Sequence, residues 1–322
     1  MVQSYFSNGK LLITGEYVVL DGALSLAIPT KHGQRMEVEF RDSEEADNTL
    51  TWYSIDSDGE TWYREEFLIE EGSLDEASTP LSLIKSDRSV RLNPTDVCNT
   101  NGVSDKLVEI INKACQMNSW FLEGGSYTVR TYLDFPNNWG LGSSSTLICN
   151  IAKWAEVDAF ELSEASFGGS GYDIAVGMMG GDILYRSPEM WEGYVFSPSF
   201  KEQLYFVHLN EKQNSREGIA RYKQKAKNGK LIERISNLTE ELIACKDFDV
   251  FQQLITEHES LIAAQVEMPT VKEKRFADYP FAIKSLGAWG GDFILACGDE
   301  NTPKYFKDKG FDTVLSYAEL IK

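Results

Sequence analysis

The sequence contains few of the residues that build disulfide frameworks and metal centres. Its five cysteines are widely scattered, none with Cys-x-x-Cys spacing. An odd number of dispersed cysteines favours reduced thiols over a disulfide framework or a zinc site. The three histidines are also far apart and form no ligand motif, so we expect them to be surface or packing residues. These residues are Cys98, Cys115, Cys149, Cys245, Cys297, His32, His208 and His258.

Positive charge and long apolar runs are also scarce. The chain has 31 Lys and Arg residues against 50 Asp and Glu residues, which gives a net charge of −19. This balance disfavours nucleic acids and anionic membranes as partners. No apolar run is long enough for a transmembrane helix, and the first residues lack the basic-then-apolar profile of a signal peptide. We therefore expect a soluble cytoplasmic protein, in which any phosphate site depends on local donors and a few cations.

The composition is otherwise that of a globular protein with a substantial core. Of the 322 residues, 42% are hydrophobic, and there are seven tryptophans and fourteen tyrosines. This length favours two domains. Glycine-rich turns give way to a new strand near residues 187–193, so we predict domains at 1–187 and 188–322.

Periodicity predicts a mixture of strands and helices. The first forty residues read as strands, and a hairpin is predicted around Asp58–Gly59. Helices are predicted from Ser104 and from about Thr146 to Asp158. In the second half, residues 231–245 and 249–265 have helical periodicity, and residues 281–298 read as a glycine-rich turn that leads into an apolar strand.

The stretch "PNNWGLGSSST", residues 136–146, is a candidate phosphate-binding loop. Gly140 and Gly142 would weaken a helix or strand, so this stretch predicts a loop that enters the following helix at its N-terminus. Such a loop presents unpaired N–H groups and a positive dipole to phosphate. The spacing excludes a P-loop and a dinucleotide fingerprint. A simple strand-to-helix turn with a serine cap is the alternative interpretation.

The stretch resembles the central motif of the GHMP kinases (galactokinase, homoserine kinase, mevalonate kinase, phosphomevalonate kinase), P-x-x-x-G-L-G-S-S-A. Ser145 stands where alanine is usual. "SNGKLLITGEYVVLDGALSLAIP" resembles the N-terminal motif of these kinases, and "IKSLGAWGGDFILACG" resembles their C-terminal motif, K-x-S-G-A-G-G-G-D. The three motifs occur in the expected order and span residues 7–298.

The resemblance implies a role for each matching residue. Asp173 would accept or orient the proton of the acceptor hydroxyl, and Lys10 would neutralise charge on the transferred phosphoryl group. Taken singly, Lys10 reads as a solvated strand lysine and Asp173 as a helix-start cap. Ser144 is the implied Mg²⁺ contact. The residues implied to cradle the ATP phosphates are Gly140, Leu141, Gly142, Ser143, Ser144, Ser145, Gly287, Ala288 and Gly290. Those implied to line the acceptor pocket are Glu16, Tyr17 and Gly171.

The motifs also indicate a branch of these kinases. "GEY" at residues 15–17 and "GGD" at 290–292 resemble phosphomevalonate kinases, whereas "GYDIA" resembles a bacterial group named for that pentapeptide, whose substrate the motif does not define. Lys106, Arg186 and Lys284 are candidates to bind a phosphate of the substrate.

The sequence departs from the family pattern at several points. Asn8 replaces a usual proline. Trp289 replaces a glycine, where its ring would narrow the phosphate site, stack on a ligand or plug the space under the loop. The interval before Asp173 is short and lacks the helix that usually supplies a magnesium-binding glutamate. Glu161 and Glu164 are nearby substitutes, with surface positions as the alternative.

The resemblance implies an α+β fold in two parts, the first like ribosomal protein S5 domain 2 and the second ferredoxin-like. It implies an ATP- and Mg²⁺-dependent kinase, monomeric or homodimeric, that phosphorylates a small molecule. Phosphomevalonate and mevalonate are the leading acceptors. The alternatives are an enzyme like diphosphomevalonate decarboxylase and a non-catalytic sensor of nucleotide or metabolite on the same fold.

Overall fold

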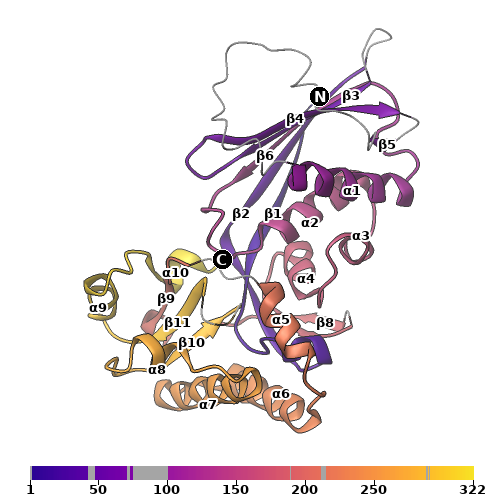
Figure 1. The fold of residues 1–322 in the computed structure, drawn as a ribbon. Helices are drawn as coiled ribbons and strands as arrows, with labels where there is room; N and C mark the ends of the chain where they lie inside the picture. The colour runs from indigo at the N-terminus through magenta and orange to yellow at the C-terminus, as the bar shows by residue number, and fades with distance from the viewer. Residues whose placement is uncertain are drawn as a thin grey trace. The chain divides into compact units, whose positions relative to one another are not determined.

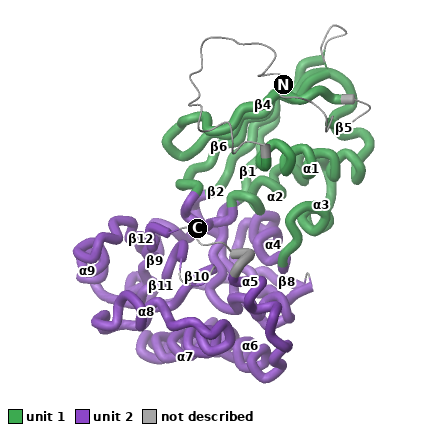
Figure 2. The backbone as a smooth tube through the Cα atoms, viewed as in Figure 1, with its two compact units in different colours: residues 1–7, 33–137, 143–169 green, residues 8–32, 138–142, 170–322 purple. Residues whose placement is uncertain are grey.

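The computed structural model describes residues 2–42, 48–70, 73–74, 101–188, 190–211, 215–287, 289 and 291–322. Two predicted nucleotide-site residues, Ala288 and Gly290, lie outside the described residues. The chain forms two compact units, shown in Figure 2. Unit 1 comprises residues 1–7, 33–137 and 143–169, and unit 2 comprises residues 8–32, 138–142 and 170–322. These units do not coincide with the predicted division at residue 187, because β1 (Val2–Leu12) and β2 (Ser25–Arg41) each contribute to both.

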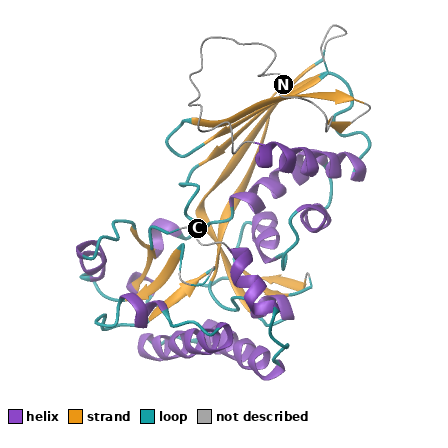
Figure 3. Ribbon diagram, viewed as in Figure 1, coloured by secondary structure: helices purple, strands orange, loops and turns teal. Residues whose placement is uncertain are grey.

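Unit 1 is a sheet with helices along one side (Figures 1 and 3). Its strands lie in the order β5, β4, β3, β6, β2. β3 runs parallel to β6, whereas β3 with β4 and β2 with β6 are antiparallel. The predicted hairpin at Asp58–Gly59 is confirmed, because it joins β3 to β4. The strand bounds are β3 Thr49–Ile55, β4 Thr61–Glu70, β5 Ser73–Leu74 and β6 Ser126–Leu133, and the helices are α1 Asn101–Met117, α2 Ser143–Ala155 and α3 Ala159–Ser166.

The core of unit 1 follows the period of the sheet. In β2, Met36 and Val38 are buried, whereas Arg35 is exposed and Glu37 is partly exposed, as expected when successive side chains point to opposite faces. The helices bury their apolar stripes in the same core. Buried members include Trp52, Phe67, Ile110, Ile111, Val129, Ile148 and Ile151.

Unit 2 contains a second, antiparallel sheet of four strands, in the order β10, β11, β9, β12. The first part of β2 also lies in unit 2, where it pairs with β7, which in turn pairs with β8. The strand bounds are β7 Ile183–Arg186, β8 Met190–Gly193, β9 Leu204–His208, β10 Ile283–Leu286, β11 Phe293–Cys297 and β12 Val314–Ser316.

Two long helices of unit 2, α6 (Gly229–Ala244) and α7 (Phe248–Val266), lie side by side, and α7 packs on β10 (Figure 1). Both confirm the helical periodicity of the sequence. Each begins at a side-chain cap, Asn228 for α6 and Asp247 for α7. The shorter elements are η1 Val18–Asp21, α4 Tyr172–Met179, η4 Lys201–Gln203, α5 Ser215–Lys223, α8 Val271–Arg275, α9 Thr302–Asp308 and α10 Tyr317–Leu320.

Within the described parts of the chain, no helix is both long and apolar enough to span a membrane.

Candidate active site

The glycine–serine stretch enters a helix, but earlier than predicted. α2 begins at Ser143 rather than near Thr146, directly after Gly142, whose φ is 91°. The serines therefore form the first helical turn, because the left-handed glycine has already reversed the chain before them. N–H groups in a first turn have no acceptor within the helix. Ser144 is exposed and Ser145 is buried.

The loop before α2 is fixed to β1 within unit 2. Lys10 N–H donates to the Leu141 carbonyl at 2.9 Å, and Lys10 Nζ donates to the Gly140 carbonyl at 3.2 Å. The Leu141 side chain is only 1% exposed and anchors the loop. Trp139 packs edge-on against Phe293 of β11, with 5.4 Å between ring centroids.

Gly140 has no room for a side chain. Its φ is 67°, and a Cβ there would lie 2.3 Å from Cγ of Asp292. The Asp292 carboxylate thus lies against the loop backbone, and it also interacts electrostatically with Lys10. The sequence motifs alone assign no role to Asp292. The available signal was its position as the acidic residue that ends the third motif.

Asp173 lies in the first turn of α4, which follows Gly171 with its φ of 84°. Its Oδ1 accepts the Ile174 N–H at 3.1 Å, but the residue at the N-cap of α4 is Gly171, so Asp173 is not the helix cap of the alternative interpretation. The half-buried carboxylate also interacts electrostatically with Lys10. Unit 2 therefore brings together the two residues predicted to be catalytic, although they are far apart in the sequence.

The surroundings of Lys10 keep its ammonium group charged. Burial alone lowers the pKa of Lys10, but charge interactions with Tyr172, Asp173 and Asp292 and a hydrogen bond with Tyr172 outweigh it, so the pKa is raised. Nζ also lies 5.7 Å from the centroid of the Tyr172 ring. Lys10 is thus not a solvated strand lysine. The sequence motifs assign no role to Tyr172, although this residue directly precedes Asp173.

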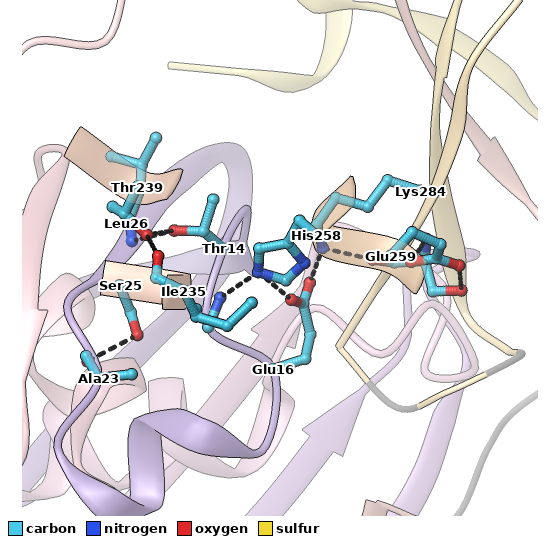
Figure 4. A network of polar contacts seen from close by, with 12 residues as sticks. Thr14, Glu16, Ala23, Ser25, Leu26, Ile235, Thr239, His258, Glu259 and Lys284 are labelled. Carbon is cyan, nitrogen blue, oxygen red and sulfur yellow. Dashed lines mark hydrogen bonds and ion pairs between the residues drawn. The ribbon is translucent and has the colours of Figure 1, made fainter. Parts of the chain in front are cut away.

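Glu16 and Tyr17, predicted to line the acceptor pocket, are both buried in unit 2. The Glu16 carboxylate is 1% exposed and is bound by Lys284 (Figure 4). The Tyr17 hydroxyl accepts the Trp289 N–H at 2.9 Å. Contact of either side chain with an acceptor stays a prediction, and in the case of Glu16 it requires a change in these buried contacts.

The third motif presents one open glycine and one buried tryptophan. Gly287 has a φ of 72°, and a Cβ there would meet nothing within 4 Å. Trp289 is 5% exposed, and its Nε1–H donates to the Pro269 carbonyl at 3.1 Å. Of the three interpretations of Trp289, the structure matches the plug, because the ring belongs to a hydrophobic cluster of unit 2.

The basic residues suggested for a substrate phosphate have protein partners. Lys284 is fully buried against Glu16. Arg186 Nη1 donates to the Gly22 carbonyl at 2.8 Å, and Lys106 Nζ donates to the Ser166 carbonyl at 2.6 Å. Lys284 is therefore the least accessible of the three to a substrate.

Metal-binding side chains do not cluster in the part of the chain that the structure describes, where no group of three or more His, Cys, Asp or Glu residues gathers. Glu161 and Glu164 are exposed on α3, as expected for surface residues. Any Mg²⁺ would thus need ligands from phosphate oxygens and water in addition to a hydroxyl such as that of Ser144.

Comparison with known proteins gives a match in structure only. No protein-family model matches the sequence, and a search of curated protein sequences finds no relative. Among solved structures, mevalonate kinase from Methanococcus jannaschii is 13% identical, with a TM-score of 0.66 over 98% of this chain and 96% of its own.

Two further solved structures are similar over nearly the whole chain. Phosphomevalonate kinase from Streptococcus pneumoniae, in complex with phosphomevalonate and AMPPNP, is 17% identical, with a TM-score of 0.65 over 98% of this chain and 99% of its own. Galactokinase from Lactococcus lactis, complexed with galactose, is 12% identical, with a TM-score of 0.65 over 98% of this chain and 92% of its own. The chain therefore has the α+β fold of the GHMP kinases along almost its entire length.

Proposed function

We propose that the chain is an ATP-dependent phosphotransferase that acts on a small metabolite. One observation carries the proposal: the Lys10 ammonium group is bonded to the Gly140 carbonyl of the glycine loop and interacts electrostatically with Asp173. A cation held between an anion-binding loop and a carboxylate is the arrangement that phosphoryl transfer needs, because this reaction depends on positioning and charge stabilisation.

The residues of the loop suit a polyphosphate chain. The left-handed glycines 140 and 142 bring the backbone to the surface of the loop, and the first turn of α2 supplies N–H groups and serine hydroxyls. Gly287 leaves open space where a side chain would otherwise stand. ATP bound there would supply the γ-phosphoryl group. Mg²⁺, with Ser144 as its protein contact, is part of the proposal.

The proposed chemistry assigns a separate role to each charged residue. Asp173 accepts the proton of the acceptor hydroxyl or orients that hydroxyl, a role that typically contributes about 10²- to 10⁴-fold to the rate. Lys10 stabilises the charge that develops on the transferred group. The Tyr172 ring, whose centroid lies 5.7 Å from Lys10 Nζ, helps to hold the ammonium group in place.

We propose phosphomevalonate or mevalonate as the acceptor. The "GEY" motif and the similarity in fold to kinases named for these substrates support this choice. Galactokinase has a similar fold, so the fold alone does not select an acceptor. Decarboxylation of mevalonate diphosphate and non-catalytic sensing are the competing functions.

The test is ADP release with mevalonate, phosphomevalonate, mevalonate diphosphate, homoserine and galactose as acceptors. We expect turnover with one of the first two. Turnover with mevalonate diphosphate and release of CO₂ would favour the decarboxylase, whereas AMPPNP binding without any turnover would favour the sensor.

Asp173→Asn tests the catalytic assignment. We expect it to abolish turnover and to leave ATP affinity nearly unchanged. Asp158→Asn is the matched control, because Asp158 is also an aspartate at a helix start and accepts the N–H groups of Phe160 and Glu161. Weaker ATP binding with an unchanged kcat in Asp173→Asn would contradict the assignment.

A further inference from the structure

Two consecutive residues of the first motif each bind the third motif. Glu16 Oε1 accepts a hydrogen bond from Lys284 Nζ in β10. Next to it, the Tyr17 hydroxyl accepts the Trp289 N–H at 2.9 Å. Gly287, the open glycine of the third motif, lies between residues 284 and 289. The two contacts therefore hold the chain on both sides of that glycine.

The contact on the β10 side is a buried ion pair. Glu16 and Lys284 are both buried, and Lys284 Nζ also donates to the Ser285 carbonyl at 2.9 Å. Separating such a pair leaves an uncompensated charge in the interior, which typically costs about 3–5 kcal/mol. The pair therefore resists displacement of β10 from the first motif.

Helix α7 also contacts both the first motif and β10 (Figure 4). His258 Nε2 accepts the Gly15 N–H at 2.9 Å. Its neighbour Glu259 accepts both the N–H and the hydroxyl of Ser285, at 3.0 and 2.8 Å. Two adjacent residues of α7 thus fix the position of the first motif relative to β10.

The contact on the other side of Gly287 depends on Tyr17, which is held in an unusual conformation. Its φ is 63°, a left-handed value that costs a residue with a side chain about 1–2 kcal/mol. Its ring stacks on that of Tyr222, with 5.9 Å between centroids. A Cβ at Gly218 of α5 would lie 2.4 Å from the Tyr17 hydroxyl, so α5 packs closely over this group. The surroundings therefore fix the hydroxyl where it receives the Trp289 N–H.

We propose that Glu16 and Tyr17 are positioning residues that hold Gly287 in place for the nucleotide, rather than residues that contact the acceptor. This inference rests on the proposed function, because it assumes that a nucleotide binds beside Gly287. Its consequence is specific: loss of either contact weakens nucleotide binding and leaves the KM for the acceptor unchanged.

Tyr17→Phe is the least disruptive test, and Tyr222→Phe is its matched control. Both variants remove one hydroxyl from the same stacked pair, but the Tyr222 hydroxyl donates to Asp21, away from the third motif. Titration calorimetry with AMPPNP should show affinity reduced about tenfold in Tyr17→Phe, the effect of roughly one lost buried hydrogen bond. Tyr222→Phe should bind within about twofold of the wild type, because its lost bond lies outside the site.

Hydrogen exchange of the peptide that spans residues 283–289 gives a second readout, independent of nucleotide. Exchange should be faster in Tyr17→Phe than in Tyr222→Phe. Equal exchange and equal AMPPNP affinity in the two variants would overturn the inference, as would an effect confined to the KM of the acceptor. Faster exchange in Tyr17→Phe, with no AMPPNP binding by the wild-type protein, would refute the proposed function while retaining the role of Tyr17 in holding the third motif.

The ion pair provides a further variant series. Lys284→Met leaves Glu16 buried without its partner, whereas the double variant Glu16→Gln/Lys284→Met removes both charges. We expect the double variant to be the more stable of the two in urea unfolding and, like Tyr17→Phe, to bind AMPPNP more weakly than the wild type. Additive effects of the two substitutions on stability would contradict a coupled pair.

Discussion

The buried carboxyl group of Glu16 should make the stability of the protein depend on pH. Burial raises the pKa of Glu16 from its usual 4.5 to about 7, even though Lys284 opposes the shift. His258 Nε2 lies 3.6 Å from Glu16 Oε2 and is neutral, because burial lowers the pKa of His258. Glu259 is the other acidic neighbour, and its pKa is also raised by burial. Between pH 4.5 and about 7, Glu16 therefore holds a proton that it would lose in the unfolded chain, and above about pH 7 it is ionised and forms the ion pair with Lys284.

The sign and size of the effect follow from this difference. Between pH 4.5 and about 7 the folded protein binds more protons at Glu16 than the unfolded chain does, so the free energy of unfolding falls as pH rises. The shift corresponds to about 3 kcal/mol, at about 1.4 kcal/mol for each pH unit. The contribution of Glu16 is fully present below pH 4.5 and is lost by the time the pH has passed its folded pKa.

The perturbation is Glu16→Gln, which keeps an oxygen to accept from Lys284 but does not titrate. Urea unfolding of both proteins from pH 4.5 to 8 gives the difference in unfolding free energy, wild type minus variant. We expect this difference to fall by about 3 kcal/mol and then level off. Parallel stability curves for the two proteins would refute a raised pKa at Glu16.

The neighbouring surface residue Glu257 provides the control for that experiment. A hydrogen bond from Arg234 lowers the pKa of Glu257. Its contribution to stability is therefore present above the pKa of the unfolded chain and is lost as pH falls. The corresponding difference for Glu257→Gln should rise to a plateau with increasing pH and never fall.

Three further predictions concern the loop and the core. Lys10→Met should reduce kcat by at least about 100-fold in steady-state assays, because it removes the cation that stabilises the transferred group; an unchanged kcat would contradict that role. Gly140→Ala should lower the free energy of unfolding in urea by more than the roughly 1–2 kcal/mol expected from its left-handed backbone alone, whereas Gly59→Ala, where a Cβ meets nothing within 4 Å, should lose only the backbone part. Cys297 should resist thiol reagents until the protein unfolds, because the side chain is buried and burial raises the pKa of its thiol; rapid labelling of the native protein, followed by mass spectrometry, would contradict this.

The sequence predicted those features that depend on local pattern. The hairpin at Asp58–Gly59 and the helical periodicity of α6 and α7 are set by neighbouring residues, and the structure confirms them. The entry of the glycine–serine stretch into a helix was also predictable, because glycines weaken the interior of a helix or strand and favour the turn that precedes one.

The sequence did not predict features that depend on distant partners. Glu16 looked like a pocket residue because its neighbours in the chain match a motif, but its burial depends on Lys284, 268 positions away. The close approach of Asp292 to Gly140 likewise requires the folded chain. The three-residue error at the start of α2 arose because serines resemble loop residues by composition, whereas a first helical turn accepts them readily.

The packing around Trp289 also has an evolutionary consequence. A tryptophan at this position fills space in the cluster that contains Tyr17, and α5 approaches the Tyr17 hydroxyl so closely that Gly218 admits no side chain. Mutation of any one of these three positions leaves the other two shaped for a neighbour that is no longer there. Substitutions at residues 17, 218 and 289 should therefore be correlated among homologous sequences. A substitution at one of these positions should be tolerated only where the other two have changed to fit it.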